Sequence, residues 1–342
     1  MVAEPVVLLP GFVLRDRYEV IKKIGQGGFG AVYEVYDRVD GKQAALKVEG
    51  SKGKNQVLKQ EASVLRHLAE VNAKHFVEFY GCGKTASFNF LIMGLVGKDL
   101  SYYRKTCNNT GKLTTATTVR LTIQAIEALE ELHQVGFVHR DVKPSNYAMG
   151  RTVKTQKTVY LLDFGLSRSY MTSDKKLRLP RTHAGFRGTV RYCSLQCHKL
   201  KELGRHDDII SVMYMSVELI KGTLPWKNRI DKKSVFRAKL RAGVNLFSDC
   251  PPEFVQIWNH VSQLTYEEIP DYNLYKKELE KIMSRKGYLS TDPFDWEEGG
   301  SGFQYSRRQG PVPDNTISRD QMASIDTVNK EDRTDAQGDG IK

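Results

Sequence analysis

Residues 139–146 read HRDVKPSN, and this stretch decides the fold. It follows an amphipathic run over residues 119–133 and precedes an apolar strand that ends in Asp163-Phe164-Gly165. Together these segments predict a helix, a polar loop, a short strand and an Asp-Phe-Gly turn. The loop carries a carboxylate, an ammonium group and an amide, and a second carboxylate follows about one strand later. An isolated His-Arg-Asp would be uninformative, but the combination at this spacing is highly specific.

Phosphoryl transfer requires groups of this kind, because it depends on positioning the phosphate and on placing positive charge against its oxygens. Asp141 can accept the proton of an attacking hydroxyl, and Lys143 places an ammonium group near the moving phosphate. Asn146 and Asp163 offer the hard oxygen ligands that Mg²⁺ prefers. We therefore predict Asp141, Lys143 and Asn146 as catalytic residues and Asn146 with Asp163 as metal ligands.

These motifs resemble those of the protein kinase superfamily, and a lysine at position 143 is typical of its serine/threonine-directed members. The resemblance implies an α+β, bilobal protein kinase fold, with a small β-rich N-lobe that has one main helix and a larger, mainly α-helical C-lobe. It also implies an enzyme that uses ATP and Mg²⁺ to phosphorylate Ser and Thr hydroxyls of protein substrates.

Composition supports one folded domain with a tail in a chain of 342 residues, of which 40% are hydrophobic. The formal net charge of +12 favours anionic partners. Five cysteines without paired spacing argue against a disulfide framework, and Cys193 and Cys197 lack the companions of a zinc site, so we expect buried or idle thiols. The apolar run 6–10 is too short to span a membrane and fits no secretory signal. We expect a cytoplasmic monomer, with the nucleus as an alternative location.

A glycine-rich segment, residues 25–30, follows a strand that begins at Tyr18. A dinucleotide-binding fold would require a helix to open at these glycines, but residues 31–36 alternate as a second strand. We therefore predict a hairpin whose backbone approaches the phosphates of ATP. The nucleotide contacts expected here are Ile24, Gly25, Gly27, Gly30 and Val32.

Lys47 lies in the middle of a third predicted strand, residues 43–49, in a pattern that resembles the kinase lysine for the α- and β-phosphates. Its partner should be a glutamate on the next helix, predicted over residues 56–68, and we choose Glu61. Glu49 is the rival. It lies on the same strand as Lys47, and its side chain points the wrong way only if the strand is regular. Further contacts to the nucleotide are expected from Ala45, from Met93 and Leu95 at the lobe connection, and from Ala148 below the adenine.

The segment 163–197 is rich in arginine and lysine, and it lacks the usual Ala-Pro-Glu. In its place residues 188–194 read GTVRYCS, which resembles the casein kinase 1 superfamily. The strings AGFRGTVRY (184–192), GRHDD (204–208) and DVKPSNYAMG (141–150) resemble its tau-tubulin kinase branch, and the likeness covers residues 13–284. Many members of that superfamily prefer acidic or already phosphorylated substrates. We expect Arg191, with Arg187, to contact such an anion.

The predicted domain boundaries follow the loss of apolar periodicity near residue 284. We predict an N-terminal extension over 1–12, an N-lobe over 13–96, a C-lobe over 97–285 and a polar tail over 286–342 that is disordered at least from 299. The tail could be regulatory or merely a linker, and its composition is compatible with both roles.

Two alternatives to an active kinase remain open. A catalytically idle kinase fold acting as a scaffold would be favoured by degenerate motif residues, and the sequence contains none. A binder of nucleic acid or microtubules would exploit the positive charge, but the aromatic–basic interleaving of single-strand binders is missing. Protein substrates, with acidic, primed or cytoskeletal proteins as candidates, are therefore expected, and nucleic acid is not.

Overall fold

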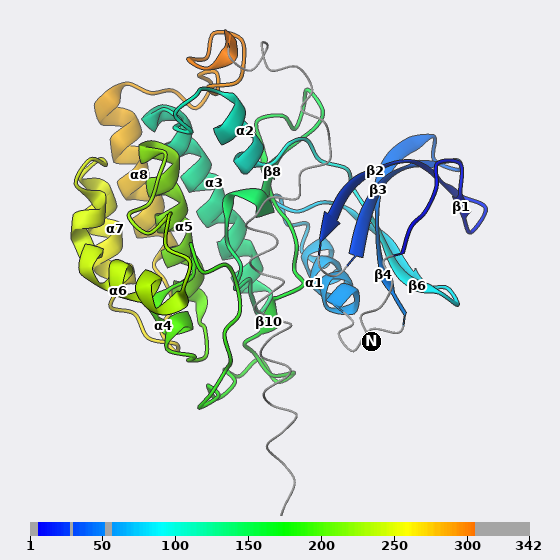
Figure 1. The fold of residues 1–342 in the computed structure, drawn as a ribbon, viewed down its shortest axis with the longest axis horizontal. Helices are drawn as coiled ribbons and strands as arrows, with labels where there is room; N and C mark the ends of the chain where they lie inside the picture. The colour runs from blue at the N-terminus through cyan, green and yellow to red at the C-terminus, as the bar shows by residue number, and fades with distance from the viewer. Residues whose placement is uncertain (1–5, 28–29, 52–56, 305–342) are drawn as a thin grey trace, which may run out of the picture.

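The computed structural model describes residues 6–27, 30–51 and 57–304. Figure 1 shows two lobes, with the β-strands of the N-terminal part on one side and most helices on the other. This arrangement confirms the predicted bilobal protein kinase fold. Among the helices of the described residues, none is long and apolar enough to cross a membrane.

The N-lobe is an antiparallel sheet in the order β1-β2-β3-β4-β6-β5, with one helix against it. Its elements are β1 (Val13–Leu14), β2 (Tyr18–Gly27), β3 (Gly30–Asp37), β4 (Lys42–Gly50), α1 (Val57–Glu70), β5 (Phe79–Lys84) and β6 (Phe88–Met93). The alternation seen in the sequence buries one face of these strands, including Val35, Leu46 and Val48. The glycine-rich segment joins β2 to β3 as a hairpin in which Gly27 pairs with Gly30, so the prediction of a hairpin rather than a helix is confirmed.

The C-lobe is built on helices. They are α2 (Leu100–Thr106), α3 (Thr115–Gln134), α4 (Leu195–His198), α5 (Arg205–Lys221), α6 (Lys232–Ala242), α7 (Glu253–Val261) and α8 (Tyr272–Lys286), with 3₁₀ turns at Pro144–Asn146 and Gly243–Phe247. Four short strands, β7 (Phe137–Val138), β8 (Tyr147–Met149), β9 (Val159–Leu161) and β10 (Arg168–Ser169), form two small ladders. Helix α5 is buried over almost its whole length, as its apolar sequence predicts.

The packed chain continues past residue 285, where the sequence placed the end of the C-lobe. Phe294 is buried, and Trp296 stacks on Tyr103 of α2 with ring centroids 4.0 Å apart. The carboxylate of Asp295 accepts hydrogen bonds from the backbone amide and the hydroxyl of Thr114, which caps α3. This segment therefore fixes the beginning of the helix that leads into residues 139–146. The part of the predicted tail beyond residue 304 lies outside the described residues.

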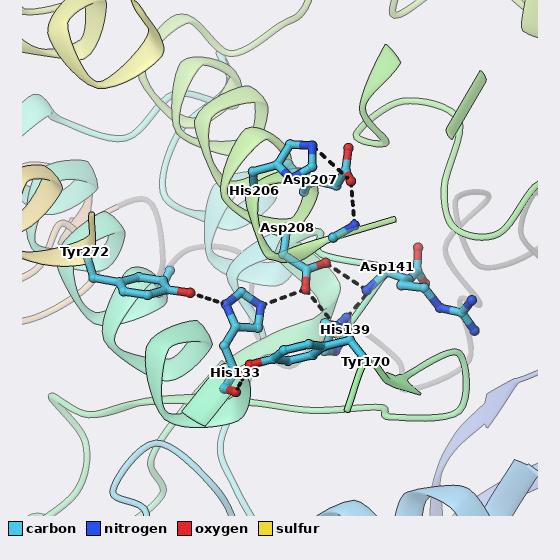
Figure 2. A network of polar contacts seen from close by, with 12 residues as sticks. His133, His139, Asp141, Tyr170, His206, Asp207, Asp208 and Tyr272 are labelled. Carbon is cyan, nitrogen blue, oxygen red and sulfur yellow. Dashed lines mark hydrogen bonds and ion pairs between the residues drawn. The ribbon is translucent and has the colours of Figure 1, made fainter. Parts of the chain in front are cut away.

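Asp208, near the start of α5, binds the backbone of the loop at residues 139–146 through its carboxylate. One carboxylate oxygen accepts a hydrogen bond from the amide of His139 at 2.7 Å, and the other accepts one from the amide of Arg140 at 2.8 Å. Figure 2 shows this carboxylate between the loop and the imidazole of His133. Because Asp208 is buried and the amides are the backbone itself, these bonds fix the position of the loop independently of its side chains.

His133 links Asp208 to the far side of the lobe. Its Nε2 lies 3.0 Å from Asp208, and its Nδ1 lies 2.7 Å from the hydroxyl of Tyr272 (Figure 2). One neutral tautomer satisfies both neighbours, with Nε2–H donating to the carboxylate and the tyrosine hydroxyl donating to Nδ1. Burial lowers the pKa of His133, and this outweighs the hydrogen bond to Asp208, which acts to raise it. The folded protein therefore keeps this imidazole neutral.

A neutral buried histidine makes stability depend on pH. The unfolded chain binds a proton at His133 near the ordinary pKa of about 6.5 and the folded chain does not, so the free energy of unfolding decreases as the pH falls below that value. We expect His133→Gln to flatten this decrease between pH 7 and pH 5.5, by at most about 1.4 kcal/mol per pH unit. Urea denaturation at several pH values measures the slope, with the exposed His183→Gln as the control. Equal slopes in wild type and His133→Gln would contradict the assignment.

Candidate active site

Lys47 joins three elements that are far apart in the sequence. Its Nζ lies 2.6 Å from a carboxylate oxygen of Glu61 on α1 and 3.1 Å from one of Asp163, which follows β9 in the C-lobe. Glu61, rather than Glu49, is thus the glutamate that Lys47 contacts. Burial alone would lower the pKa of Lys47, but the two carboxylates outweigh it and raise the pKa. The ammonium group is therefore charged at any physiological pH and ties the lobes together.

Asp163 is ionised for a related reason. Desolvation acts to raise the pKa of its carboxyl group, but the positive charges of Lys47 and Lys143 outweigh this and lower it to about 2. The side chain is still 45% exposed, so the carboxylate remains accessible. Its backbone φ of 64° lies in the left-handed region, which non-glycine residues rarely adopt, and such strain is typical of functional positions. Asp163 is thus an accessible anion held in an unusual conformation.

Glu49, the rejected rival, has a separate contact with α1. It is buried on β4 two residues after Lys47, so both side chains lie on the same face of the strand. One oxygen of Glu49 accepts a hydrogen bond from the amide of Leu58 in the first turn of α1 at 3.0 Å. The other accepts one from the side chain of Asn89 on β6 at 3.1 Å. Glu49 therefore fixes the beginning of the helix that carries Glu61.

The turn after Asp163 allows α1 to approach closely. A Cβ atom on Gly165 would lie 2.3 Å from the Cγ1 atom of Val57, which is far inside van der Waals contact. The glycine is therefore required by packing between the Asp-Phe-Gly turn and the first residue of α1. This contact and the Lys47 ion pairs together set the position of α1 relative to the C-lobe.

The loop at 139–146 brings its charged side chains to one point. The two oxygens of Asp141 accept hydrogen bonds from Lys143 Nζ at 2.7 Å and from the hydroxyl of Thr189 at 2.7 Å. Lys143 Nζ also lies 3.4 Å from that hydroxyl. Asn146 donates to the carbonyl of Asp141 at 2.9 Å through its side-chain nitrogen. Asp141 is therefore an oriented carboxylate, and Thr189 connects it to the segment 187–194.

The residues expected around adenine come from both lobes. Ala45 on β4 pairs with Met93 at the end of β6, and Ala148 lies on β8. The connection between the lobes is fixed to β8, because the amide of Gly97 donates to Met149 and the amide of Met149 donates to Lys98. Leu95 lies on this connection. In the glycine-rich hairpin, Ile24, Gly25 and Gly27 lie on β2 and Gly30 and Val32 on β3, while residues 28–29 at its tip lie outside the described residues.

Arg187 and Arg191, the two expected anion contacts, have different surroundings. Arg191 lies 3.3 Å from the buried carboxylate of Glu218, which also contacts Arg104 at 3.1 Å. Trp226 donates to the carbonyl of Arg191 at 2.8 Å. These contacts give Arg191 a role in fixing the segment 187–194 to α5.

Arg187 belongs to a basic cluster around the loop, which consists of Arg140, Arg168, Arg181 and Arg187 with one acidic member, Glu202. Burial, together with the charges of Arg181 and Arg168, lowers the pKa of Arg140 to about 10. Glu202 lies 2.5 Å from Arg181 and 3.5 Å from Arg168. The cations outnumber the single carboxylate, so this cluster has a local excess of positive charge.

Sequence reasoning missed two contributors to the site. Thr189 was visible in the string GTVRYCS, but nothing in its spacing placed its hydroxyl on Asp141. Glu49 was considered only as a partner for Lys47, and its bond to Leu58 requires the three-dimensional position of α1. Both are tertiary contacts between segments that the sequence separates by 9 and 48 residues.

Comparison with known proteins gives a consistent result. The protein kinase domain model matches residues 18–286. A probable serine/threonine-protein kinase of Dictyostelium discoideum is 37% identical over 84% of this chain and 58% of its own length. The serine/threonine-protein kinase spe-6 of Caenorhabditis elegans is 32% identical over 84% of this chain and 78% of its own. A Caenorhabditis elegans protein assigned by name to casein kinase I is 31% identical over 85% of this chain and 86% of its own.

The match spans less than two thirds of the Dictyostelium relative, and most of each Caenorhabditis relative. Within the matched residues lie the glycine-rich hairpin, Lys47, Glu61, the loop at 139–146 and Asp163. Two of these relatives carry names that assign them to serine/threonine kinases. The chain belongs to the protein kinase family.

Proposed function

We propose that this chain is an active serine/threonine protein kinase that transfers the γ-phosphate of ATP to hydroxyl groups of protein substrates. The observation that carries the proposal is the contact of Lys47 with Glu61 and Asp163 at the same time. This contact places a permanent cation beside an ionised, accessible carboxylate, between two lobes that would both supply nucleotide contacts. A cation so placed stabilises the charge on the oxygens of a transferred phosphate.

Asn146 and Asp163 would hold the metal ion, which we propose to be Mg²⁺. Their chemistry fits, because an amide oxygen and an ionised carboxylate are hard ligands, and the amide nitrogen of Asn146 is already bonded to Asp141. Within residues 6–27, 30–51 and 57–304, no group of three or more His, Cys, Asp and Glu could hold a metal alone. This suits Mg²⁺, which protein sites often bind through one or two carboxylates together with phosphates and water. When bound, the metal would neutralise charge on the phosphates.

The remaining steps fall to the chain itself. Asp141 orients the substrate hydroxyl and accepts its proton, and its own orientation is set by Thr189 and Lys143. Lys143 Nζ, bonded to Asp141, provides a second cation near the transferred group. Asp208 holds the loop backbone in place, so these side chains need little reorganisation during the reaction.

Removing either side of the central contact should abolish phosphorylation. Lys47→Ala removes the cation, and Asp163→Asn removes the carboxylate charge, so each should reduce kcat for casein phosphorylation by at least about 10²-fold. Transfer of radiolabel from ATP measures the rate. The control is Lys59→Ala, which removes an exposed lysine from α1. Equal labelling by wild type and both variants would refute the assignment, and nucleotide binding by a wild-type chain that transfers nothing would favour a scaffold.

Glu49 should act as a positioning residue for Glu61. Glu49→Ala removes a buried, charge-assisted hydrogen bond worth about 1.5–3 kcal/mol, so we expect a loss of about 10-fold or more in kcat/KM. Glu49→Gln keeps one acceptor and should lose less. Faster amide hydrogen exchange in the first turn of α1 would accompany the loss, a change that Glu70→Ala at the exposed end of the helix should not cause. If Glu49→Ala leaves exchange in α1 unchanged, the positioning role is wrong.

We further propose that the chain lies in the tau-tubulin kinase branch of the casein kinase 1 superfamily and prefers acidic or phosphorylated substrates. The string GTVRYCS in place of Ala-Pro-Glu and the similarity to a protein assigned by name to casein kinase I support the superfamily. The strings AGFRGTVRY, GRHDD and DVKPSNYAMG are the basis for the branch. The excess of positive charge around Arg140 supports the preference, because it lies beside the loop that carries Asp141. Arg187 is the member of the cluster nearest Thr189 in the sequence.

A peptide comparison tests this preference. Arg187→Ala should reduce kcat/KM for a peptide with an upstream phosphoserine by about 10-fold, and should change the rate for the matched unphosphorylated peptide by much less. Lys176→Ala, which removes an exposed cation from the same segment, is the control. Uniform losses on both peptides would show that Arg187 supports the loop rather than the substrate anion.

A further inference from the structure

Two thiols, an imidazole and a buried ammonium group meet behind the segment 187–194. We call this group the Cys193 cluster; its members are Cys193, Cys197, His198 and Lys239. Cys193 lies just before Ser194, whose side chain caps α4, and Cys197 lies in that helix four residues after Cys193. Both cysteines are buried, as the sequence suggested, and they pack in one cluster with Phe186 and Leu203.

Lys239 reaches the cluster from α6. Its Nζ donates to the carbonyl of Cys193 at 2.6 Å and to the carbonyl of Val190 at 2.7 Å, and it lies 3.7 Å from the sulfur of Cys193. The same nitrogen lies 3.3 Å from Nε2 of His198. A buried ammonium group so close to a sulfur favours the thiolate over the thiol. It also opposes binding of a metal cation to the two sulfurs.

The two sulfurs differ in acidity. Burial acts to raise the pKa of Cys193, but the neighbouring Cys197 and the charge of Lys239 outweigh it, so the pKa lies below its usual value. The neighbouring Cys193, together with burial, raises the pKa of Cys197. This is the pattern of a nucleophilic sulfur with a resolving thiol beside it.

Both sulfurs lie against the backbone around Thr189. Cys197 donates from its sulfur to the carbonyl of Arg187 at 3.1 Å, and Cys193 lies 3.6 Å from the carbonyl of Val190. Thr189, between these two carbonyls, is the residue that bonds Asp141. The state of the two sulfurs is therefore coupled to the position of a group at the candidate active site.

We propose that Cys193 and Cys197 are a redox-sensitive pair, which a peroxide oxidises to an intramolecular disulfide that inhibits the protein. The thiolate of Cys193 attacks one peroxide oxygen, forming a sulfenic acid and releasing hydroxide, which is protonated to water. The sulfur of Cys197 then attacks the sulfenic sulfur, forming the S–S bond and releasing a second water. Two thiols and one hydrogen peroxide thus give one disulfide and two waters. Cys193 reacts first, because it is 6% exposed and Cys197 only 1%.

Inhibition follows from the hydrogen bonds that the disulfide removes. Neither sulfur keeps a hydrogen, so the carbonyl of Arg187 loses the donor that Cys197 supplied. The carbonyl of Val190 still accepts its hydrogen bond from Lys239 Nζ. The sulfurs must also approach each other to form a bond of about 2.05 Å, which pulls the end of the segment towards α4. Both changes act on the residues on either side of Thr189. The inhibitory effect rests on the proposed kinase function, whereas the disulfide itself does not.

Mass spectrometry tests the covalent step directly. The full chain is treated with hydrogen peroxide, remaining thiols are alkylated, and the protein is digested with trypsin. Cleavage after Arg191 and after Lys199 releases both cysteines in one peptide, residues 192–199. We expect this peptide to become lighter by two hydrogen atoms and to escape alkylation, and dithiothreitol to reverse both changes. Cys82, which is exposed, reports that peroxide reached the protein.

The activity assay is run on the same samples. We expect peroxide to reduce casein phosphorylation by wild type several-fold, dithiothreitol to restore it, and Cys197→Ala to resist the loss. Cys82→Ala should behave as wild type. Full alkylation of both cysteines at a dose that oxidises Cys82 would overturn the proposal, as would a covalent link from Cys193 to Lys239 instead of Cys197. A disulfide that forms without reversible loss of activity would overturn its inhibitory role while leaving the kinase assignment intact.

Discussion

The arrangement of the molecule depends on one partly buried ammonium group, that of Lys47. It contacts carboxylates from α1 and from the Asp-Phe-Gly turn, so a single cation connects strand β4, the N-lobe helix and the C-lobe. Taking a cation out of water without partners is costly, and this cost makes the relative position of the three elements specific. Glu49 and Gly165 act on the same geometry, one by holding the first turn of α1 and the other by allowing its close approach.

The C-lobe supplies a second, more rigid constraint. Asp208 binds the backbone of the loop rather than its side chains. His133 contacts both Asp208 and the hydroxyl of Tyr272, and so fixes the position of the Asp208 carboxylate. Asp141, Lys143 and Asn146, which we propose as the base, its lysine and a metal ligand, are therefore carried by a loop that is fixed to the buried helix α5. A fixed loop in one lobe and an ion-paired lysine in the other form a site in which charge is arranged before the substrate binds.

The sequence predicted the fold because several local signals agreed. The alternation in residues 18–49, the glycine-rich hairpin and the motif at 139–146 each specify one element, and their order specifies the kinase architecture. It could not predict contacts that depend on tertiary position. Lys47 and Glu49 share a strand face and both reach α1, so the choice of Glu61 relied on resemblance. The pairing of Arg191 with Glu218 joins residues 27 apart, with no local pattern to reveal it. The packing of Phe294 and Trp296 was not predicted, because the surrounding segment is polar in composition. The two aromatic residues themselves were the sequence feature that indicated it.

The central claim is that Lys47 acts through its ion pair with Glu61, and a double-mutant cycle tests it most directly. The value of kcat/KM is measured for wild type, Lys47→Ala, Glu61→Gln and the double variant. Residues that act as a unit show strongly non-additive losses. The account predicts that Glu61→Gln reduces kcat/KM in the wild-type background but causes no further loss once Lys47 has been removed. An equal fold-loss from Glu61→Gln in both backgrounds would contradict it.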